Sequence, residues 1–377
     1  MEDLGIKTGD PLPDLFQGKY LGKKVLITGH TGFKGSWLSI WLRLLGADVM
    51  GYALEPASCL DNYILCGLQN KIRGIYGDVR DVSSLNQAFD AFQPDMVFHL
   101  AAQPNVRLSY AQPQETFETN VMGTVNVMEA FRKSKSASVC IIVTSDKCYE
   151  NKEQIWGYRE NDRMGGFDPY SASKGCAELV TSAYNHSFFQ NPQGKAVASV
   201  RAGNVFGGGD WTKDRIIPDC MKALLNGTDI EIRNPSSVRP WQFVLEPLYG
   251  YLLLGAKILK NPSQFSGAWN FGPDFSSVIP VNRLVNMVVD IWNKGAARTQ
   301  INYPENLSSP HEAALLSLDC TKAKMLLDWS PRLSLHDTLA YTVHWYQNYA
   351  SSDVHAICIQ QINDYCKLPP VIGPERS

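Results

Sequence analysis

The stretch Val25–Gly35, VLITGHTGFKG, decides the fold. Its apolar, β-branched start is typical of a buried strand, and Gly29, Gly32 and Gly35 follow before a helical pattern over Gly35–Leu45. Glycines at a strand-to-helix turn let the backbone approach a pyrophosphate closely, and the amide groups at the positive end of the helix then hold it. The stretch predicts a dinucleotide site. The alternative is a glycine turn that serves only helix packing.

Strand-like runs recur after this turn. Several of them are apolar on both faces, which indicates strands that are covered on both sides. They lie at residues 49–54, 75–78, 96–100, 140–144 and 197–200. Because helical patterns separate them, we expect an α/β fold with a doubly wound parallel sheet of the Rossmann type.

The character of the chain changes near residue 203, where glycines and prolines become frequent. We therefore expect an N-terminal extension over residues 1–19, a dinucleotide-binding domain over 20–202 and a smaller, mixed C-terminal substrate lobe over 203–377. Part of residues 235–262 is expected to pack back on the first domain.

The composition excludes several classes of protein. With 44% hydrophobic and 19% charged residues the chain is typical of a globular protein, and its net charge of −2 offers no broad basic surface for nucleic acid or an anionic membrane. No apolar run reaches the roughly 20 residues that span a bilayer. Nine cysteines without a CxxC pair or a Cys/His metal spacing favour reduced thiols, a cytoplasmic location and no bound metal. A small anionic ligand fits this chain best.

A tyrosine and a lysine lie four residues apart at Tyr170 and Lys174, after an Asp168-Pro169 pair that is typical of a helix start. Positions four apart share one helical face, so the phenol and the ammonium can meet in one site. A nearby cation lowers the pKa of a phenol, and Tyr170 could then act as a base. Because this spacing is common by chance, a purely structural pair is the alternative.

The fifth predicted strand ends abruptly in Thr144, Ser145, Asp146 and Lys147. A parallel sheet binds ligands beyond the carboxyl ends of its strands, so these side chains should face the same crevice as Tyr170. A carboxyl group and an amine in one site can serve as general acid and general base, provided that Asp146 holds a proton and Lys147 is neutral when needed. The alternative is a solvated Asp-Lys turn.

The GxxGxxG turn and the YxxxK pair together resemble the extended short-chain dehydrogenase/reductase superfamily. The resemblance implies that Tyr170 is the hydroxyl base, and that Lys174 activates it and binds the nicotinamide ribose. It also implies cofactor contacts from the glycine turn and from the ends of the third, fourth and fifth strands. These residues are Gly29, Thr31, Gly32, Phe33, Gly35, Asp78, Val79, Leu100, Ala101, Ala102 and Thr144. Asp78 could instead cap a helix.

The expected cofactor is NAD. In the superfamily an acidic residue at the end of the second strand usually holds the adenosine ribose and marks NAD. The corresponding position here, near Ala53, is not acidic, and Glu55 lies two residues later. NADP therefore stays open.

Within the superfamily, the segments GHTGFKGSWLS, AAQPNVRLSY, TSDKCYEN, YSASKGCAELV and VRAGNVFGGGDW resemble the CDP-glucose 4,6-dehydratase family. The resemblance implies an NAD-dependent hydro-lyase. Hydride leaves sugar C4, water is eliminated across C5 and C6, and the hydride returns to C6. The product, CDP-4-dehydro-6-deoxyglucose, would serve the dideoxy sugars of surface polysaccharide such as lipopolysaccharide O-antigen.

The same resemblance assigns roles to side chains. Asp146 is implied as the acid and Lys147 as the base, with Ser145, Tyr170 and Lys174 as the other catalytic residues. Enzymes of the dTDP-glucose type carry a glutamate at the place of Lys147. The implied ligands of the nucleotide sugar are Gln103, Asn204, Arg215, Arg239 and His311. Arginine suits bidentate pyrophosphate binding, although a surface salt bridge is the alternative for each arginine. The segment GTVNVMEAFRK resembles a helix that pairs in homodimers, with a tetramer as the alternative.

Rival functions of two kinds stay open. One is another enzyme on the same scaffold, either a dTDP- or GDP-sugar dehydratase or a 4-epimerase. An epimerase needs no acid and base for elimination, so Asp146 and Lys147 argue against it. The other is a non-catalytic NAD(P)-sensing protein, which the intact Tyr170, Lys174 and Asp146 disfavour.

Overall fold

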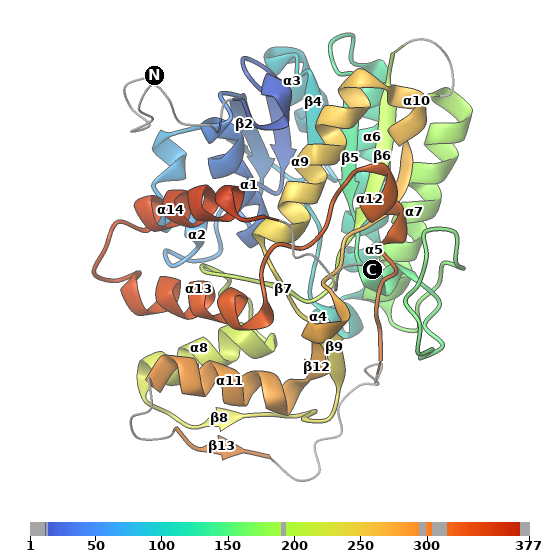
Figure 1. The fold of residues 1–377 in the computed structure, drawn as a ribbon. Coiled ribbons are helices and arrows are strands. Elements are labelled where there is room, and N and C mark those ends of the chain that lie inside the picture. Colours follow the sequence, from blue (N-terminus) through green and yellow to red (C-terminus); the bar gives the residue numbers. More distant parts are fainter. Residues whose placement is uncertain (1–11, 13, 190–193, 294–298, 304–314, 370–377) are drawn as a thin grey trace.

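The computed structural model describes residues 12, 14–189, 194–293, 299–303 and 315–369. At its centre lies a parallel seven-stranded sheet in the order β11-β6-β5-β4-β1-β2-β3 (Figure 1). The strands are β1 Lys24–Thr28, β2 Asp48–Ala53, β3 Arg73–Tyr76, β4 Met96–His99, β5 Val139–Val143, β6 Ala196–Arg201 and β11 Gly267–Asn270. The predicted α/β fold with a doubly wound parallel sheet is confirmed.

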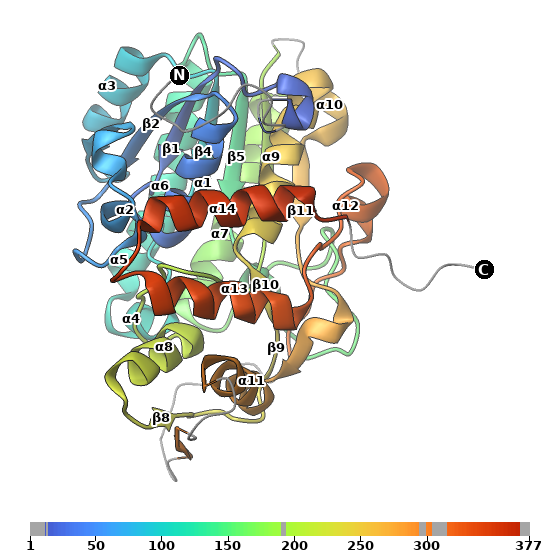
Figure 2. The ribbon, with the colours of Figure 1, turned by 60° about the vertical axis from the view of Figure 1, so that its left-hand side comes forward.

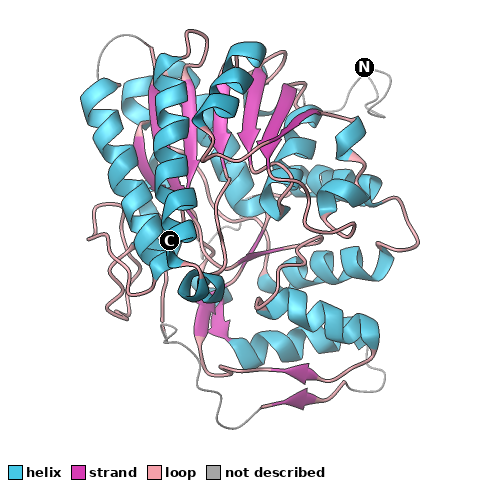
Figure 3. Ribbon diagram, turned by 180° about the vertical axis from the view of Figure 1, so that it is seen from behind, coloured by secondary structure: helices cyan, strands magenta, loops and turns pink. Residues whose placement is uncertain are grey.

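The sheet is buried on both faces, as the apolar strands predicted. Val25 and Ile27 of β1 point into a large core, and Leu26 points into a second one on the other face. Helices α1 Phe33–Leu44 and α9 Leu245–Lys260 cover the first face, and α14 Val354–Lys367 packs on α1 (Figure 2). Helices α3 Val82–Phe92, α6 Gly123–Lys133 and α7 Pro169–Phe188 cover the second (Figure 3).

A smaller mixed lobe lies beyond the carboxyl ends of the strands (Figure 1). Its helices are α8 Ile216–Asn226, α11 Val281–Asn293 and α13 Leu335–Asn348. Its strands form three pairs, β7 Val205–Phe206 with β10 Gln242–Phe243, β9 Val238–Pro240 with β12 Val278–Pro280, and β8 Ile230–Glu231 with β13 Ile301–Asn302.

Short helices complete the connections. The α-helical ones are α2 Asn62–Leu65, α4 Val106–Ala111, α5 Pro113–Phe117, α10 Pro262–Phe265 and α12 Thr321–Leu326. The 3₁₀ turns are η2 Leu15–Gly18, η3 Leu68–Asn70, η5 Asp146–Cys148 and η6 Phe275–Ser277, and η4 Glu118–Met122 is a π-helix.

The chain passes between sheet and lobe more than once. After β6 it enters the lobe at β7, returns to the sheet as α9 and β11, and leaves again at β12. Helix α9 lies within the range 235–262 that was expected to pack back, and it contacts β5 and α1. The predicted division at residues 202 and 203 stays a prediction.

The described part of the predicted extension packs on α9. Leu12 and Phe16 of the extension are buried, and the adjoining Tyr20 donates a hydrogen bond of 2.7 Å from its hydroxyl to the carbonyl oxygen of Leu252. The ring of Phe16 lies 5.2 Å from that of Tyr249. This segment is therefore part of the core.

Two further observations bear on the composition of the chain. All nine cysteines carry free thiols. Among the described residues, no helix is long and apolar enough to cross a membrane.

Candidate active site

The glycine turn forms a backbone cradle. Gly29 has a φ of +78°, and a Cβ atom there would lie 2.7 Å from the amide nitrogen of Ala101. A Cβ atom on Gly35 would overlap the carbonyl oxygen of Gly29. Helix α1 begins at Phe33 after Gly32, which makes no side-chain capping bond, so an anion can bind to the first amide groups of the helix. This geometry fits the pyrophosphate of a dinucleotide.

A cleft of about 940 Å³ runs from this turn to the lobe. Its size is that of a typical ligand site. Every predicted cofactor, catalytic and substrate residue within the described ranges lines it. The predicted substrate residue His311 lies outside the described residues. Segments far apart in the sequence therefore meet in one cleft, as the sheet topology predicted.

The outer end of the cleft is bounded by Ala53, Leu54, Asp78 and Val79. Both carboxylate oxygens of Asp78 accept hydrogen bonds from the guanidinium of Arg80, which lowers the pKa of this carboxyl group. The alternative interpretation of Asp78 as a helix cap is wrong, because Asp81 caps α3 through the amide groups of Ser83 and Ser84. Asp78 lines the cleft instead.

The end of β5 turns sharply at η5 and presents two functional groups to the cleft. The Ser145 hydroxyl accepts a hydrogen bond from the Lys147 amide at 3.3 Å and donates one to Asp146 Oδ1 at 3.0 Å. Asp146 is buried, and its Oδ2 packs against Gly203 without a hydrogen-bond partner in the described structure. Lys147 is half-buried. Ser145 thus fixes the turn and orients the Asp146 carboxyl group.

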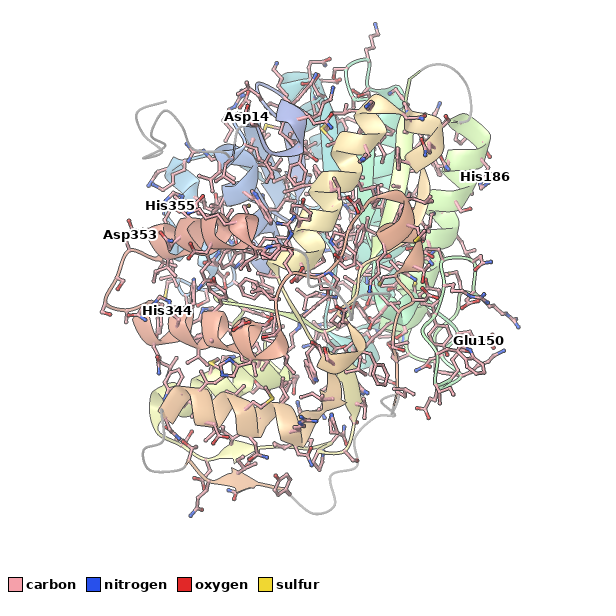
Figure 4. All side chains as sticks on the ribbon, viewed as in Figure 1. Asp14, Glu150, His186, His344, Asp353 and His355 are labelled. Atoms are coloured by element: carbon pink, nitrogen blue, oxygen red, sulfur yellow. The ribbon has the colours of Figure 1, made fainter. Side chains whose placement is uncertain are left out.

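A second acidic residue near this turn lies outside the cleft. Glu150, labelled in Figure 4, lies on the outer side of the molecule and does not line the cleft. Its carboxylate forms ion pairs with Lys152 at 3.6 Å and Arg163 at 3.5 Å. Glu150 therefore cannot stand in for the glutamate that dTDP-glucose enzymes carry at the place of Lys147.

The tyrosine and lysine of α7 lie together as their spacing predicted, but the predicted effect on the tyrosine is wrong. Asp168 caps the helix through the Ser171 amide at 2.9 Å, and burial raises the pKa of Tyr170 to about 12. The contributions that oppose this rise come from Ser145 and from the Arg215 guanidinium. The Lys174 ammonium donates a 3.4 Å hydrogen bond to the carbonyl oxygen of Val143. Desolvation, which spacing alone cannot reveal, outweighs the neighbouring charge.

A lysine in the glycine turn was missed from the sequence. Lys34 lines the cleft, where burial lowers the pKa of its amine to about 7. Arg215 and Lys174 lower this pKa further, and Asp146 and Asp210 oppose the change. A cation in the first turn of a helix is disfavoured by the helix dipole, and this was the signal that could have found it.

The lobe contributes charged side chains to the other end of the cleft. Arg215 pairs with the buried carboxylate of Asp210 at 3.1 Å, and Arg233 pairs with Asp214 at 2.6 Å. Arg239 is buried in β9 and donates a 2.9 Å hydrogen bond to the carbonyl oxygen of Val238. Arg215 and Arg239 were predicted, whereas Arg233 was not. This end of the cleft therefore offers three guanidinium groups to a phosphate, and carboxylates hold two of them in place.

Two predicted substrate residues are fixed by the chain itself. The Gln103 side chain donates to Thr116 Oγ1 at 2.9 Å, and the Gln103 amide donates to the Asn120 side chain at 2.8 Å. Asn204 has a φ of +49°, and its carbonyl oxygen accepts a 3.3 Å hydrogen bond from the Gln242 amide. Both residues are held in position at the cleft wall.

Solved structures share this architecture. MoeE5 in complex with UDP-glucose and NAD is 25% identical with a TM-score of 0.70, and the match covers 87% of this chain and 100% of that one. DesIV, a dTDP-glucose 4,6-dehydratase from Streptomyces venezuelae solved with NAD and TYD, is 24% identical with a TM-score of 0.74, covering 86% of this chain and 97% of that one. At this level of identity, DesIV shows only that the fold is shared.

Sequence comparison is more specific. CDP-glucose 4,6-dehydratase from Salmonella typhimurium is 47% identical over 350 residues, which cover 91% of this chain and 96% of that protein. CDP-paratose 2-epimerase from Salmonella typhi is 26% identical, with coverage of 85% and 98%. The predicted resemblance to sugar-nucleotide dehydratases is confirmed. A family model described as GDP-mannose 4,6 dehydratase matches residues 26–342, and the chain belongs to this family of nucleotide-sugar dehydratases.

Proposed function

We propose that the chain is an NAD-dependent hydro-lyase that converts CDP-glucose to CDP-4-dehydro-6-deoxyglucose. One observation carries the proposal. Asp146 and Lys147 line the same cleft as Tyr170, Lys174 and the glycine turn, so an acid, an amine and a hydride-transfer site serve one ligand. The 47% identity to CDP-glucose 4,6-dehydratase supports the choice of substrate.

Each side chain has a defined task in this reaction. The Tyr170 oxygen takes the proton from the sugar 4-hydroxyl, and the positive charge of Arg215 favours the resulting phenolate. The glycine turn would hold NAD, which when bound would supply an acceptor for the C4 hydride and a hydride donor for C6. The Lys147 amine removes the C5 proton, which the C4 carbonyl has made acidic, and gives a proton back to C5 when hydride reaches C6. Asp146, which lines the cleft, gives a proton to the departing 6-hydroxyl.

The nucleotide end is assigned by charge. Arg215, Arg233 and Arg239 line the lobe side of the cleft, where their guanidinium groups could donate hydrogen bonds to a diphosphate. Gln103 and Asn204 line the part nearer the sugar. The preference for cytosine rests on the similarity to the Salmonella typhimurium protein.

Exposed apolar side chains and free thiols bear on assembly and location. A homodimer formed through α6 and α7 is supported by two exposed apolar side chains, Met122 beside α6 and Leu179 on α7. Nine free cysteines support a cytoplasmic location. A role in making dideoxy sugars for surface polysaccharide such as O-antigen would follow from the product.

A substrate panel tests the proposal. Purified protein is given CDP-, dTDP-, UDP- or GDP-glucose with NAD⁺ or NADP⁺, and the 4-keto sugar is detected by its ultraviolet absorbance in base. We expect turnover of CDP-glucose with NAD⁺. Release of a 4-epimer without loss of water would replace the dehydratase with an epimerase. Cofactor binding without any product would favour the alternative of a non-catalytic NAD(P)-sensing protein.

A further inference from the structure

A buried carboxylate with no part in the proposed chemistry lies one helical turn after Lys174. Glu178 is 4% exposed and accepts three hydrogen bonds from two strands of the sheet. The donors are Arg201 at 2.7 Å and Ser199 at 2.6 Å, both on β6, and the Thr144 hydroxyl at the end of β5. Glu178 therefore joins α7 to the residue that precedes the catalytic turn.

Its partner Arg201 holds the other end of the same turn. The guanidinium donates hydrogen bonds to the Tyr149 hydroxyl at 2.6 Å and to the Glu160 carbonyl oxygen at 3.0 Å. Tyr149 directly follows η5, and its hydroxyl donates to Asn270 of β11 at 2.8 Å. One ion pair thus fixes the chain immediately before Ser145 and immediately after Cys148.

Charge gives the pair a second link to the site. Burial lowers the pKa of Lys174 to about 8, and Glu178 is the first cause that opposes this change. The other titratable groups that act on Lys174, or on which it acts, are Lys34 of α1, His99 of β4 and Cys148 of η5. Burial keeps His99 neutral by lowering its pKa to about 3, and it raises the pKa of the Cys148 thiol. Among these groups, Glu178 alone carries a negative charge.

Stability alone is a weak reason for such a pair. Removing two charges from water costs free energy that their attraction often fails to recover. We propose that Glu178, anchored by Arg201, is a positioning residue for the dehydratase reaction: it holds the catalytic turn in register with α7 and supplies the negative charge that faces the Lys174 ammonium. This inference rests on the proposed function.

The test compares Glu178→Gln with Glu246→Gln. Glu246 is a second buried glutamate, whose carboxylate accepts hydrogen bonds from Tyr365 and from two backbone amides away from the cleft. In Glu178→Gln we expect kcat for CDP-glucose to fall at least about tenfold while KM stays within about twofold. The alkaline limb of its pH profile should move down by about one pH unit, because Lys174 has lost its counter-charge. In Glu246→Gln the limb should not move.

A conservative variant separates charge from geometry. Glu178→Asp keeps the charge and withdraws the carboxylate, so we expect a lower kcat with the alkaline limb in place. If Glu178→Gln does not fold, kcat and the alkaline limb of Glu178→Asp test the inference instead. Wild-type kcat in folded Glu178→Gln or Glu178→Asp, or an unmoved limb in folded Glu178→Gln, would overturn the inference.

A failure of the proposed function can be recognised separately. If the wild-type protein dehydrates none of the nucleotide sugars, the proposed function is lost. The pH dependence of NADH binding, followed by NADH fluorescence, then still reports on Lys174. The same downward shift in Glu178→Gln would support the role of Glu178, and identical profiles would refute it.

Discussion

The two ends of the cleft offer different kinds of chemical group to a ligand. At the cofactor end the ligand meets mainly backbone, since Gly29 and Gly35 leave no room for a side chain and α1 offers its first amide groups. At the nucleotide end it meets side chains, with Arg215 and Arg233 each held by a carboxylate from the lobe. A side chain added at the cofactor end should therefore abolish ligand binding. The loss of one arginine at the nucleotide end should only weaken binding.

The largest effect is expected from filling the backbone cradle. In Gly35→Ala the new Cβ would overlap the Gly29 carbonyl oxygen, so the turn must move. We expect NAD binding to be lost and stability to fall by about 1–3 kcal/mol. Calorimetric titration with NAD⁺ and urea unfolding measure the two effects. In Gly32→Ala the Cβ would lie 3.4 Å from the same oxygen, so this variant should unfold like the wild type. Wild-type NAD affinity in Gly35→Ala would contradict the steric explanation.

The catalytic turn lies between the two ends and should separate two steps of the reaction. Lys147→Ala should still oxidise C4 but stall before water is lost, with kcat lower by about 10²–10⁴-fold. Reduced cofactor should then accumulate on the enzyme and be visible by its absorbance. Lys152→Ala, which removes a lysine paired with Glu150 on the outer surface, is the control. Normal turnover in Lys147→Ala would remove this residue from its proposed role.

Helix α9, which lies outside the cleft, contains a group that should make stability depend on pH. Burial raises the pKa of Glu246 on α9 from 4.5 to about 7. The folded state then binds more protons than the unfolded state between these values, so the free energy of unfolding falls as pH rises through this window. The loss should be at most about 3 kcal/mol by pH 8. Urea unfolding at several pH values should show a smaller loss in Glu246→Gln. Equal slopes for both proteins would contradict this.

The smallest effect is expected at the nucleotide end. Arg233→Gln should raise the KM for CDP-glucose by about tenfold, which is about 1.4 kcal/mol. Arg215→Gln should raise KM and also lower kcat, because the Arg215 charge opposes the rise in the pKa of Tyr170 and favours its phenolate. Steady-state kinetics distinguishes the two arginines. An equal fall of kcat in both variants would contradict this division of roles.

The sequence predicted the parts of the molecule that local sterics control. The glycine turn and the six strands up to β6 were found within two or three residues, because apolar runs and glycines act locally. The third strand is the least accurate, since it was expected over 75–78 and ends at Tyr76. The seventh strand, β11, was missed because GAWN is short and has no β-branched residue, and only its pairing with β6 makes it a strand.

What the sequence could not predict depends on burial and on contacts between distant residues. The spacing of Tyr170 and Lys174 predicted that they meet, but not that desolvation would raise the pKa of the phenol. Glu178 and Arg201 form an ion pair between a helix and a strand, and no spacing rule marks such a pair. Lys34 acts on groups of the catalytic turn and the lobe, which only the folded cleft brings near.

The late return of the chain to the sheet has a consequence for how the protein can be divided. Residues Gly267–Asn270 cover the backbone of Ala198–Arg201, so a fragment that ends at residue 202 would leave β6 as a bare edge strand. Exposed edges of this kind recruit other chains and promote aggregation. The nucleotide-binding half should therefore not be stable as an independent folding unit. The ribosome must synthesise the chain as far as β11 before the edge of β6 can be covered.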